Sequence, residues 1–377
     1  MAGIYIHIPY CKTRCVYCDF FTQTNLESKR KIISAYCEEL ALRKNFLHNP
    51  IIETIYFGGG TPSLLSYGDF ADIFNAIRSN FTLSDDLEIT LEANPDDLTD
   101  EYVDMLLSAG FNRISIGIQS FNNDELRFLN RRHSAEKAIE AVRLCQRKGF
   151  DNISIDLMYG LPDQTLDSWK YSLRQAISLN VQHISSYHLI YEKGTKLYNM
   201  LDRGMVKETD EDISSDMYLS MAEYLKNADF IHYEVSNFAR EGFYSKHNSS
   251  YWTGAEYLGI GPAAHSFNGE NRSWNVASIL KYLDGIKQGV PNLEIEEQDN
   301  VTAYNDYILT RMRTMWGSDI TEINSRFGEK FKAYCLKNVL KYLESGKVKV
   351  SDNRLIISED SFLVSDGIMS DLMYIGK

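Results

Sequence analysis

Strand-like and helix-like segments alternate through residues 1–228 of this 377-residue chain, and this order constrains the fold more than any other feature. Short runs of β-branched and aromatic residues predict strands, and the amphipathic stretches between them predict helices. Six such units in series predict a parallel sheet with right-handed crossovers, curved into a partial (βα)6 barrel rather than a closed barrel of eight units. The predicted strands are residues 4–8, 54–57, 88–92, 113–118, 152–158 and 183–190, and the predicted helices are residues 27–45, 67–79, 99–109, 123–147, 165–179 and 209–227.

The pattern changes after this region. Residues 229–300 are expected to form extended segments and loops that complete or cover the barrel. Beyond them, apolar helical patterns are followed by two short strand patterns, which predicts a small winged-helix-like α+β cap. We therefore predict three parts, residues 1–228, 229–300 and 301–377, with C-terminal helices near 303–314, 320–326 and 329–344 and strands near 347–350 and 354–357.

The charge balance limits the possible partners. The chain has 39 Lys and Arg against 52 Asp and Glu, a formal net charge of −13. Such a chain, without a basic stripe, is not expected to bind nucleic acid or an anionic membrane surface. No run approaches the roughly 18 apolar residues of a membrane-spanning helix, and the first residues enter a strand pattern without a charged leader. We therefore expect a cytoplasmic protein without a membrane helix.

Three of the six cysteines, Cys11, Cys15 and Cys18, lie close together. A structural zinc site would need a fourth ligand, which His7 could supply only by leaving its strand face. A thiol–disulfide pair would leave one cysteine unexplained. An iron–sulfur cluster held by three thiolates would leave one iron open to an outside ligand. The remaining cysteines have helical patterns typical of buried core positions: Cys37, Cys145 and Cys335.

Polar residues and glycines follow the predicted strands. Because the carboxyl ends of parallel strands meet at one edge of a sheet, we expect these residues to share one site. Consecutive glycines let the backbone approach a ligand closely, although they also suit a flexible turn. Inward-facing carboxylates favour ligand binding or ion pairing, because an unpaired buried charge is costly. The residues at the strand ends are Gly58, Gly59, Gly60 and Thr61, then Glu92, Gln119 and Asp156.

The loop Cys11-x3-Cys15-x2-Cys18, followed by Gly58-Gly59-Gly60-Thr61-Pro62, resembles the radical S-adenosylmethionine (SAM) family. Within it, nearly the whole chain is similar to the branch of oxygen-independent coproporphyrinogen III oxidase. This resemblance implies a [4Fe–4S] cluster whose open iron binds SAM, and reductive cleavage of SAM to a 5′-deoxyadenosyl radical. The resemblance also implies the SAM contacts: Tyr5, Tyr17, Gly59, Gly60, Thr61, Glu92, Gln119, Arg131 and Asp156.

The chain departs from the oxidases in two ways. Phe20 stands where they have a further cysteine, and only ten residues precede the cysteine loop. The segment His247-Asn248-Ser249-Ser250-Tyr251-Trp252 instead resembles one linked to haem binding in a subgroup described as haem chaperones. That resemblance makes His247 a candidate axial ligand, with Tyr251 and Trp252 beside the porphyrin. A surface loop in which His247 bonds the backbone is the alternative. Further candidates are Lys246 and Arg240 for the propionates, and His265 is a second, less favoured candidate for the iron ligand.

The resemblance leaves two functions open. One is a haem chaperone that binds the cluster, SAM and haem and delivers haem to apo-haemoproteins, with a flavodoxin-like reductase as a possible partner. The other is an enzyme that oxidises coproporphyrinogen III without oxygen. A zinc-stabilised barrel without a redox role is a third hypothesis. No motif selects the electron donor, the oligomeric state or productive SAM cleavage.

Overall fold

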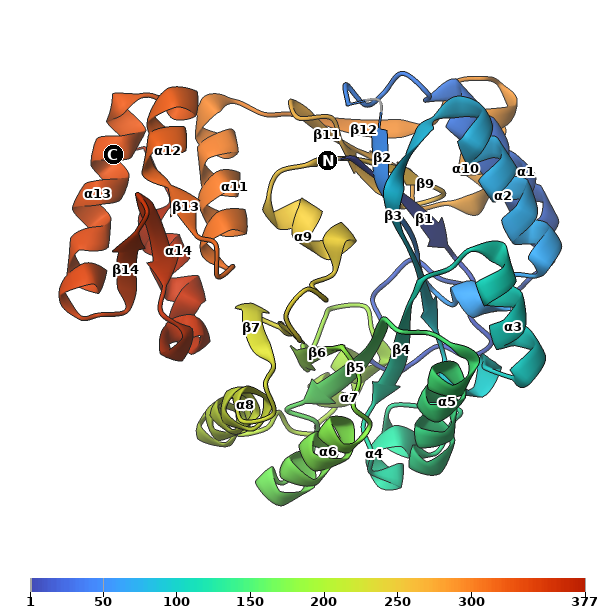
Figure 1. Cartoon of the computed structure of the whole chain (residues 1–377), viewed down its shortest axis with the longest axis horizontal. Helices are drawn as coiled ribbons and strands as arrows, with labels where there is room; N and C mark the ends of the chain where they lie inside the picture. Colours follow the sequence, from blue (N-terminus) through green and yellow to red (C-terminus); the bar gives the residue numbers. More distant parts are fainter. Residues whose placement is uncertain (1, 50, 377) are drawn as a thin grey trace.

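The computed structural model describes residues 2–49 and 51–376. Its main sheet has the strand order β12-β11-β10-β9-β1-β2-β3-β4-β5-β6-β8-β7. The strands from β9 through β1 to β6 pair in parallel, and the sheet curves with helices on its outer side (Figure 1). The predicted α/β class with a parallel sheet is therefore confirmed. The parallel strands are β1 (Ala2–Ile8), β2 (Ile51–Gly59), β3 (Thr82–Ala93), β4 (Arg113–Gln119), β5 (Ile153–Tyr159), β6 (His183–His188) and β9 (Glu256–Ile260).

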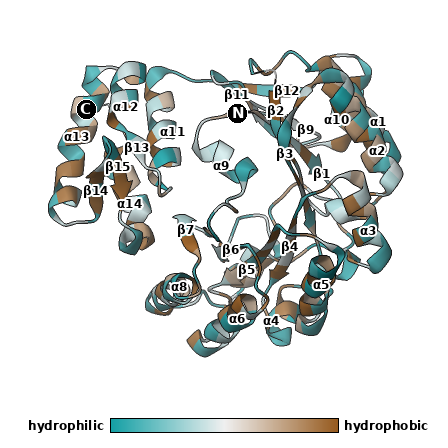
Figure 2. Ribbon diagram, viewed as in Figure 1, coloured by the Kyte–Doolittle hydropathy of each residue, from teal (hydrophilic) through white to brown (hydrophobic). Residues whose placement is uncertain are grey.

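Local sequence signals set the ends of the outer helices. Before α2, the Ser66 hydroxyl accepts a hydrogen bond from the Asp69 N–H, and the Asp69 carboxylate accepts one from the Ser66 N–H. Helices α3 and α5 end at Gly110 and Gly149, which have the left-handed conformation that glycine adopts without strain. Isoleucines alternate with polar or small residues along β4, β5 has a similar hydrophobic pattern, and the surrounding helices are mixed (Figure 2). The helices are α1 (Lys29–Leu42), α2 (Tyr67–Asn80), α3 (Asp100–Ala109), α4 (Asn123–Phe128), α5 (Ala135–Lys148), α6 (Leu166–Ser178), α7 (Lys196–Asp202) and α8 (Glu211–Lys226).

The single helix predicted over residues 123–147 is wrong, because the chain breaks between α4 and α5. Asn130 has a φ of 61°, in the left-handed region, and Ser134 starts a new helix by accepting a hydrogen bond from the Lys137 N–H. The break leaves Arg131 outside both helices, so its side chain reaches the interior of the curved sheet.

Residues 229–300 add strands at both edges of the sheet. Strands β7 and β8 join antiparallel next to β6, and β10, β11 and β12 join next to β9. This segment also forms two helices that were not predicted. A seven-residue helix such as α9 is too short to show a clear period in sequence. The elements are β7 (Ile231–Glu234), β8 (Asn237–Ala239), α9 (Lys246–Trp252), β10 (His265–Phe267), β11 (Asn271–Asn275), α10 (Ile279–Lys287) and β12 (Leu293–Glu297).

The C-terminal region forms helices beside a second, three-stranded sheet of order β13-β15-β14 (Figure 1). The three predicted helices and two predicted strands are confirmed. Strand β13 and helix α14 were not predicted. The winged-helix-like character and the boundaries of the three parts stay predictions. No helix within residues 2–49 and 51–376 has the length and hydropathy to span a bilayer. The elements are α11 (Asn300–Met312), β13 (Ser318–Asp319), α12 (Ile320–Phe327), α13 (Glu329–Glu344), β14 (Val348–Ser351), β15 (Arg354–Ile357) and α14 (Ser365–Leu372).

Candidate functional site

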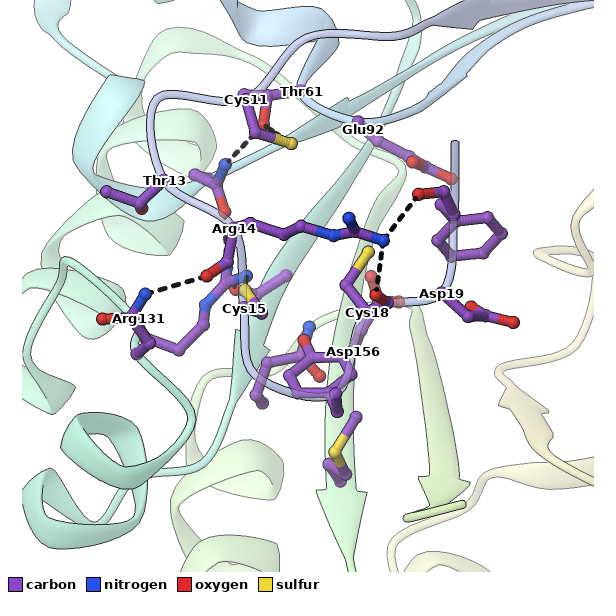
Figure 3. A pocket seen from close by; sticks show the side chains of 18 of the residues that line it. Cys11, Thr13, Arg14, Cys15, Cys18, Asp19, Thr61, Glu92, Arg131 and Asp156 are labelled. Atoms are coloured by element: carbon purple, nitrogen blue, oxygen red, sulfur yellow. Dashed lines mark hydrogen bonds between the residues drawn. The ribbon is translucent and has the colours of Figure 1, made fainter. Parts of the chain in front are cut away.

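A cavity of about 450 Å³ lies at the carboxyl ends of the parallel strands. The three cysteines of the loop after β1 face it together with side chains from β3 and β5 and from the break between α4 and α5 (Figure 3). Every predicted SAM residue except Tyr5 lines this cavity. They are Tyr17, Gly59, Gly60, Thr61, Glu92, Gln119, Arg131 and Asp156.

The cysteine loop is fixed at its base and near its tip. At the base, the Cys11 N–H donates to the Gln23 carbonyl (3.0 Å), and the Gln23 N–H donates to the Pro9 carbonyl (2.9 Å). Near the tip, the Val16 carbonyl accepts a hydrogen bond from the Leu197 N–H (2.8 Å), and the Val16 side chain is buried in a small apolar cluster. Because both ends of the loop are held, its cysteines face the cavity from a defined backbone.

The glycines after β2 are required by close packing against β1. A Cβ on Gly59, whose φ is 99°, would lie 2.5 Å from the His7 ring, and a Cβ on Gly60 would lie 2.6 Å from the Tyr10 carbonyl oxygen. Side chains there would collide with the protein itself. The flexible-turn interpretation is therefore wrong, because the segment is tightly packed, and both glycines leave backbone exposed to the cavity.

Glu92 at the end of β3 is held by two donors. The Tyr56 hydroxyl donates to Glu92 Oε1 (2.8 Å), and the Gly59 N–H donates to Oε2 (3.2 Å). Burial raises the pKa of Glu92 to about 7, and the nearby Asp156 carboxylate contributes in the same direction. The carboxylate therefore changes protonation close to neutral pH.

A bulge in β4 directs Gln119 toward the cavity. The pairing with β5 shifts register between Gly117 and Gln119, and Gln119 has a φ of 71°, which is strained for this residue type. On β5, Asp156 Oδ1 accepts a hydrogen bond from Ser115 (3.2 Å), and burial raises the pKa of its carboxyl group. An amide and a carboxylate from neighbouring strands thus face the same space.

Arg131 connects the cysteine loop to the sheet. Its guanidinium donates to Cys15 Sγ (3.4 Å), to Asn94 Oδ1 (2.5 Å) and to the Gly117 carbonyl oxygen. Its Nε is buried and has no hydrogen-bond partner among the described residues. The cavity thus brings the three thiols together with the guanidinium of Arg131 and the carboxylates of Glu92 and Asp156, groups that suit a zwitterionic ligand with additional hydroxyl groups.

Comparisons with known proteins agree with this arrangement. Residues 5–176 match the radical SAM superfamily. The protein named haem chaperone HemW in Mycobacterium tuberculosis is 32% identical over 376 residues, which cover 98% of this chain and 94% of that protein. The HemW of Bacillus subtilis is 32% identical over 374 residues, which cover 98% of both chains. The chain belongs to the HemW family of radical SAM proteins.

A solved structure shows the same fold as this HemW-family chain. It is coproporphyrinogen III oxidase (HemN) from Escherichia coli, a radical SAM enzyme, with a TM-score of 0.83 and 22% sequence identity. The match covers 99% of this chain and 90% of that chain. At this identity the likeness establishes the radical SAM fold, with its curved parallel sheet, and leaves the activity open.

The radical SAM family implies a [4Fe–4S] cluster and SAM, and the cavity residues fit both. Cys11, Cys15 and Cys18 provide three soft sulfur donors on one loop, and the Thr61 hydroxyl donates to Cys11 Sγ (3.4 Å). Burial raises the pKa of Cys18 to about 11, and the two neighbouring cysteines add to this rise. The Cys18 thiol is thus held in its neutral form at neutral pH, and a bound metal would stabilise its thiolate form instead.

His7, considered above as a fourth zinc ligand, faces away from these cysteines. Its Nε2 lies 3.0 Å from the Phe21 carbonyl oxygen and its Nδ1 lies 3.2 Å from the Tyr5 hydroxyl. Across residues 2–49 and 51–376, no three His, Cys, Asp or Glu side chains converge as ligands of a single metal ion. In a four-iron cluster each cysteine binds its own iron, so the sulfur atoms are spaced more widely than around one ion.

The segment expected to bind haem forms helix α9, which packs inside the curve of the sheet (Figure 1). His247 is 1% exposed, its Nδ1 lies 2.8 Å from Thr54 Oγ1, and its Nε2 lies 2.8 Å from the Tyr251 hydroxyl. Its ring stacks on Tyr56 with centroids 4.9 Å apart, and burial lowers the pKa of the imidazole to about 3. Both ring nitrogens therefore have protein partners, and the predicted role of His247 in haem binding stays a prediction.

The other candidate haem residues contact different parts of the protein. Trp252 stacks beneath the Arg313 guanidinium, 4.0 Å from the ring centroid. Lys246 pairs with Asp86 (2.5 Å), and Arg240 donates to Asn180 (3.1 Å). Different arginines line the hollow beside Trp252: Arg272, Arg311 and Arg326.

Tyr5 packs behind Gly58, against Tyr56, and lines a separate hollow, so its predicted contact with SAM stays a prediction. Other cavity residues were missed. Because strand residues two apart share a face, Gln119 and Asp156 could have indicated several of them. The missed residues with this signal are Ser115, Gly117 and Met158.

Proposed function

We propose that this chain binds a [4Fe–4S] cluster through Cys11, Cys15 and Cys18, binds SAM in the adjoining cavity, and carries haem to apo-haemoproteins. The observation that carries the first part of the proposal is the placement of all three cysteines on one wall of the cavity that also holds Glu92 and Asp156. The HemW relatives, similar over 98% of the chain and named haem chaperones, support the second part.

The protein's contribution to SAM binding follows from the side chains that face the cavity. Arg131 is suited to the carboxylate of an amino acid, Glu92 to ribose hydroxyls, and the combined charge of Glu92 and Asp156 to a sulfonium. The exposed backbone of Gly59 and Gly60 suits the polar end of a methionine moiety. When bound, the cluster supplies a low-potential electron and an open iron site.

The test uses anaerobically prepared full-length protein. Iron, acid-labile sulfide and zinc are quantified, and the same sample is titrated with SAM and with haem. Four irons and four sulfides per chain, saturable binding of both ligands, and passage of haem to an apo-haemoprotein are the expected results. Stoichiometric zinc without sulfide would contradict the cluster, and no haem-dependent change in absorbance would contradict the carrier function.

The same sample separates carrier from enzyme. Reduced protein is incubated with SAM and coproporphyrinogen III, and the mixture is assayed for protoporphyrinogen IX and 5′-deoxyadenosine. A haem carrier is expected to produce no protoporphyrinogen. Sustained turnover would instead assign the chain to oxygen-independent coproporphyrinogen III oxidation.

A further inference from the structure

One face of the β10–β11 hairpin gathers four side chains that the cluster and SAM site does not use. In the antiparallel register, His265 lies opposite Trp274 and Phe267 lies opposite Arg272, so these four side chains share a face. Ser266, on the other face, bonds to Arg43 Nη2 (3.0 Å) and belongs to the buried structure beneath. The hairpin therefore presents an imidazole, two aromatic rings and a guanidinium together.

His265 is the histidine of this region whose ring nitrogens have no hydrogen-bond partner among the described residues. Its ring stacks on Trp274, with centroids 5.4 Å apart and an interplanar angle of 24°, which fixes its plane. The side chain is exposed and lines a hollow of about 430 Å³ with Tyr5, Phe20 and Tyr257. A ring nitrogen of His265 can therefore offer its lone pair to a ligand, whereas both ring nitrogens of the buried His247 already have hydrogen-bond partners.

A second hollow of about 320 Å³ adjoins the first, because Tyr251 and Tyr257 line both. These two rings meet edge to face with centroids 4.6 Å apart. The second hollow lies between the sheet and helices α11 and α12, and arginine side chains line it together with the two tyrosines. Its arginines and the acidic partners they now contact are Arg272 with Asp306 (2.9 Å), Arg311 with Glu322 (3.6 Å) and Arg326 with Glu322 (2.9 Å).

These features match the chemistry of haem. Its iron takes an imidazole ligand, its macrocycle packs on aromatic side chains, and its two propionates pair with guanidinium groups. The imidazole lies in one hollow and the guanidinium groups in the next, on either side of the same tyrosine pair. Phe20, whose side chain is 58% exposed, extends the apolar wall toward the cysteine loop.

We propose that haem binds across these two hollows, with His265 as the iron ligand and Arg272 as the nearest propionate partner. This inference rests on the proposed haem-carrier function and names its site. Tyr251 forms the wall between the hollows, and His247 positions Tyr251 from the buried side through the hydrogen bond to its hydroxyl. The haem-linked segment therefore shapes the site, while the ligand comes from the hairpin.

The first experiment titrates ferric haem into full-length wild type, His265→Ala, His247→Ala and His48→Ala, with the Soret band and the low-spin electron paramagnetic resonance signal as readouts. His48, whose side chain is 63% exposed and contacts Glu256, is the matched control. We expect His265→Ala to lose the histidine-ligated spectrum and to regain it with free imidazole. His48→Ala is expected to retain both the spectrum and the affinity. His247→Ala is expected to keep the histidine-ligated spectrum but to bind haem more weakly, because Tyr251 loses its support, and circular dichroism reports whether each variant is folded.

If His265→Ala retains the histidine-ligated spectrum, the assignment of His265 as the iron ligand is overturned. This holds whether or not His247→Ala loses the spectrum. If wild type binds no haem, the proposed function fails, and this outcome is distinct because it precedes any variant. The second experiment uses metal-free protoporphyrin IX, which needs no iron ligand. We expect binding of the porphyrin to quench the fluorescence of Trp274, and the Trp274→Phe variant identifies that signal. The affinity should be unaffected by His265→Ala and about tenfold weaker in Arg272→Gln. Unchanged affinity in Arg272→Gln overturns the placement of the propionates.

Discussion

Two polar layers lie within the curved sheet, and they use their polar atoms in opposite ways. At the carboxyl ends of the strands, Glu92 and Asp156 face a cavity and have raised carboxyl pKa values because they are buried. Around α9, His247 and Thr54 are fully buried, and the His247 ring bonds to Thr54 and to Tyr251. Polar side chains thus face ligand space in one layer and stabilise the fold in the other. Availability depends on whether the protein already occupies the lone pairs.

The largest expected effect is the loss of iron when a cysteine of the loop, rather than a buried core cysteine, is replaced. Replacing Cys11, Cys15 or Cys18 by Ala is expected to remove nearly all cluster iron, because each is proposed to bind its own iron. Cys335 is buried in α13, away from the cavity, and Cys335→Ala is the matched control, expected to retain iron. Iron and sulfide analysis together with the charge-transfer absorbance measures both. Full iron content in all three loop variants would contradict the proposed ligands.

The second prediction tests the layer around α9. His247→Ala is expected to lower the free energy of unfolding by about 3 kcal/mol, because it leaves a cavity against Tyr56 and removes a partner of Thr54 and Tyr251. Urea unfolding of the metal-free protein measures the change, with the exposed His48→Ala as control. A loss below about 0.5 kcal/mol would show that the layer is not structural.

The third prediction tests the cavity layer. Arg131→Gln is expected to weaken SAM binding about 10- to 100-fold, in line with the roughly 1.5–3 kcal/mol of a hydrogen bond to a charged group. Arg127 lies in the adjacent helix α4 with its side chain 73% exposed, so Arg127→Gln is the matched control. Calorimetric titration of anaerobic protein gives both affinities, and thermal unfolding identifies any loss of fold. Equal affinities in the two variants would remove Arg131 from the SAM site.

Regular periodicity and the convergence of parallel strand ends were sufficient to predict the six central strands and most of the cavity. These signals are local, or follow from a general rule of topology. The break around Arg131, between Asn130 and Ser134, was missed because the helical pattern continues on both sides of it.

The hydrogen bonding of the buried His247 could not be predicted from the sequence, for a different reason. Its partner Thr54 lies 193 positions away in sequence, so the hydrogen bond exists only once the chain has folded. The bulge at Gln119 and the gathering of His265 and Arg272 on one hairpin face depend equally on strand register. The register between two strands depends on both strands and on the turn that joins them, so the pattern within one strand does not specify it.

The fourth prediction follows from the raised pKa of Glu92. Its carboxyl group is mostly protonated below about pH 7, and only the ionised form attracts a cationic ligand strongly. SAM affinity is therefore expected to rise as pH rises through 7, approaching tenfold per pH unit below the pKa. Dissociation constants measured between about pH 6 and pH 8 should follow this trend, and Glu92→Gln should flatten it. A flat profile in wild type would contradict a role for Glu92 ionisation.

The smallest expected effect concerns Tyr56, which contacts both layers: its ring stacks on His247 and its hydroxyl donates to Glu92. Tyr56→Phe keeps the stacking and removes the donor that favours ionised Glu92. The loss of about 1 kcal/mol of hydrogen bonding should raise the pKa of Glu92 by roughly half to one unit and move the midpoint of the SAM affinity profile upward equally. Stability in urea should change much less than in His247→Ala. An unchanged midpoint would mean that the layers meet at Tyr56 without influencing one another.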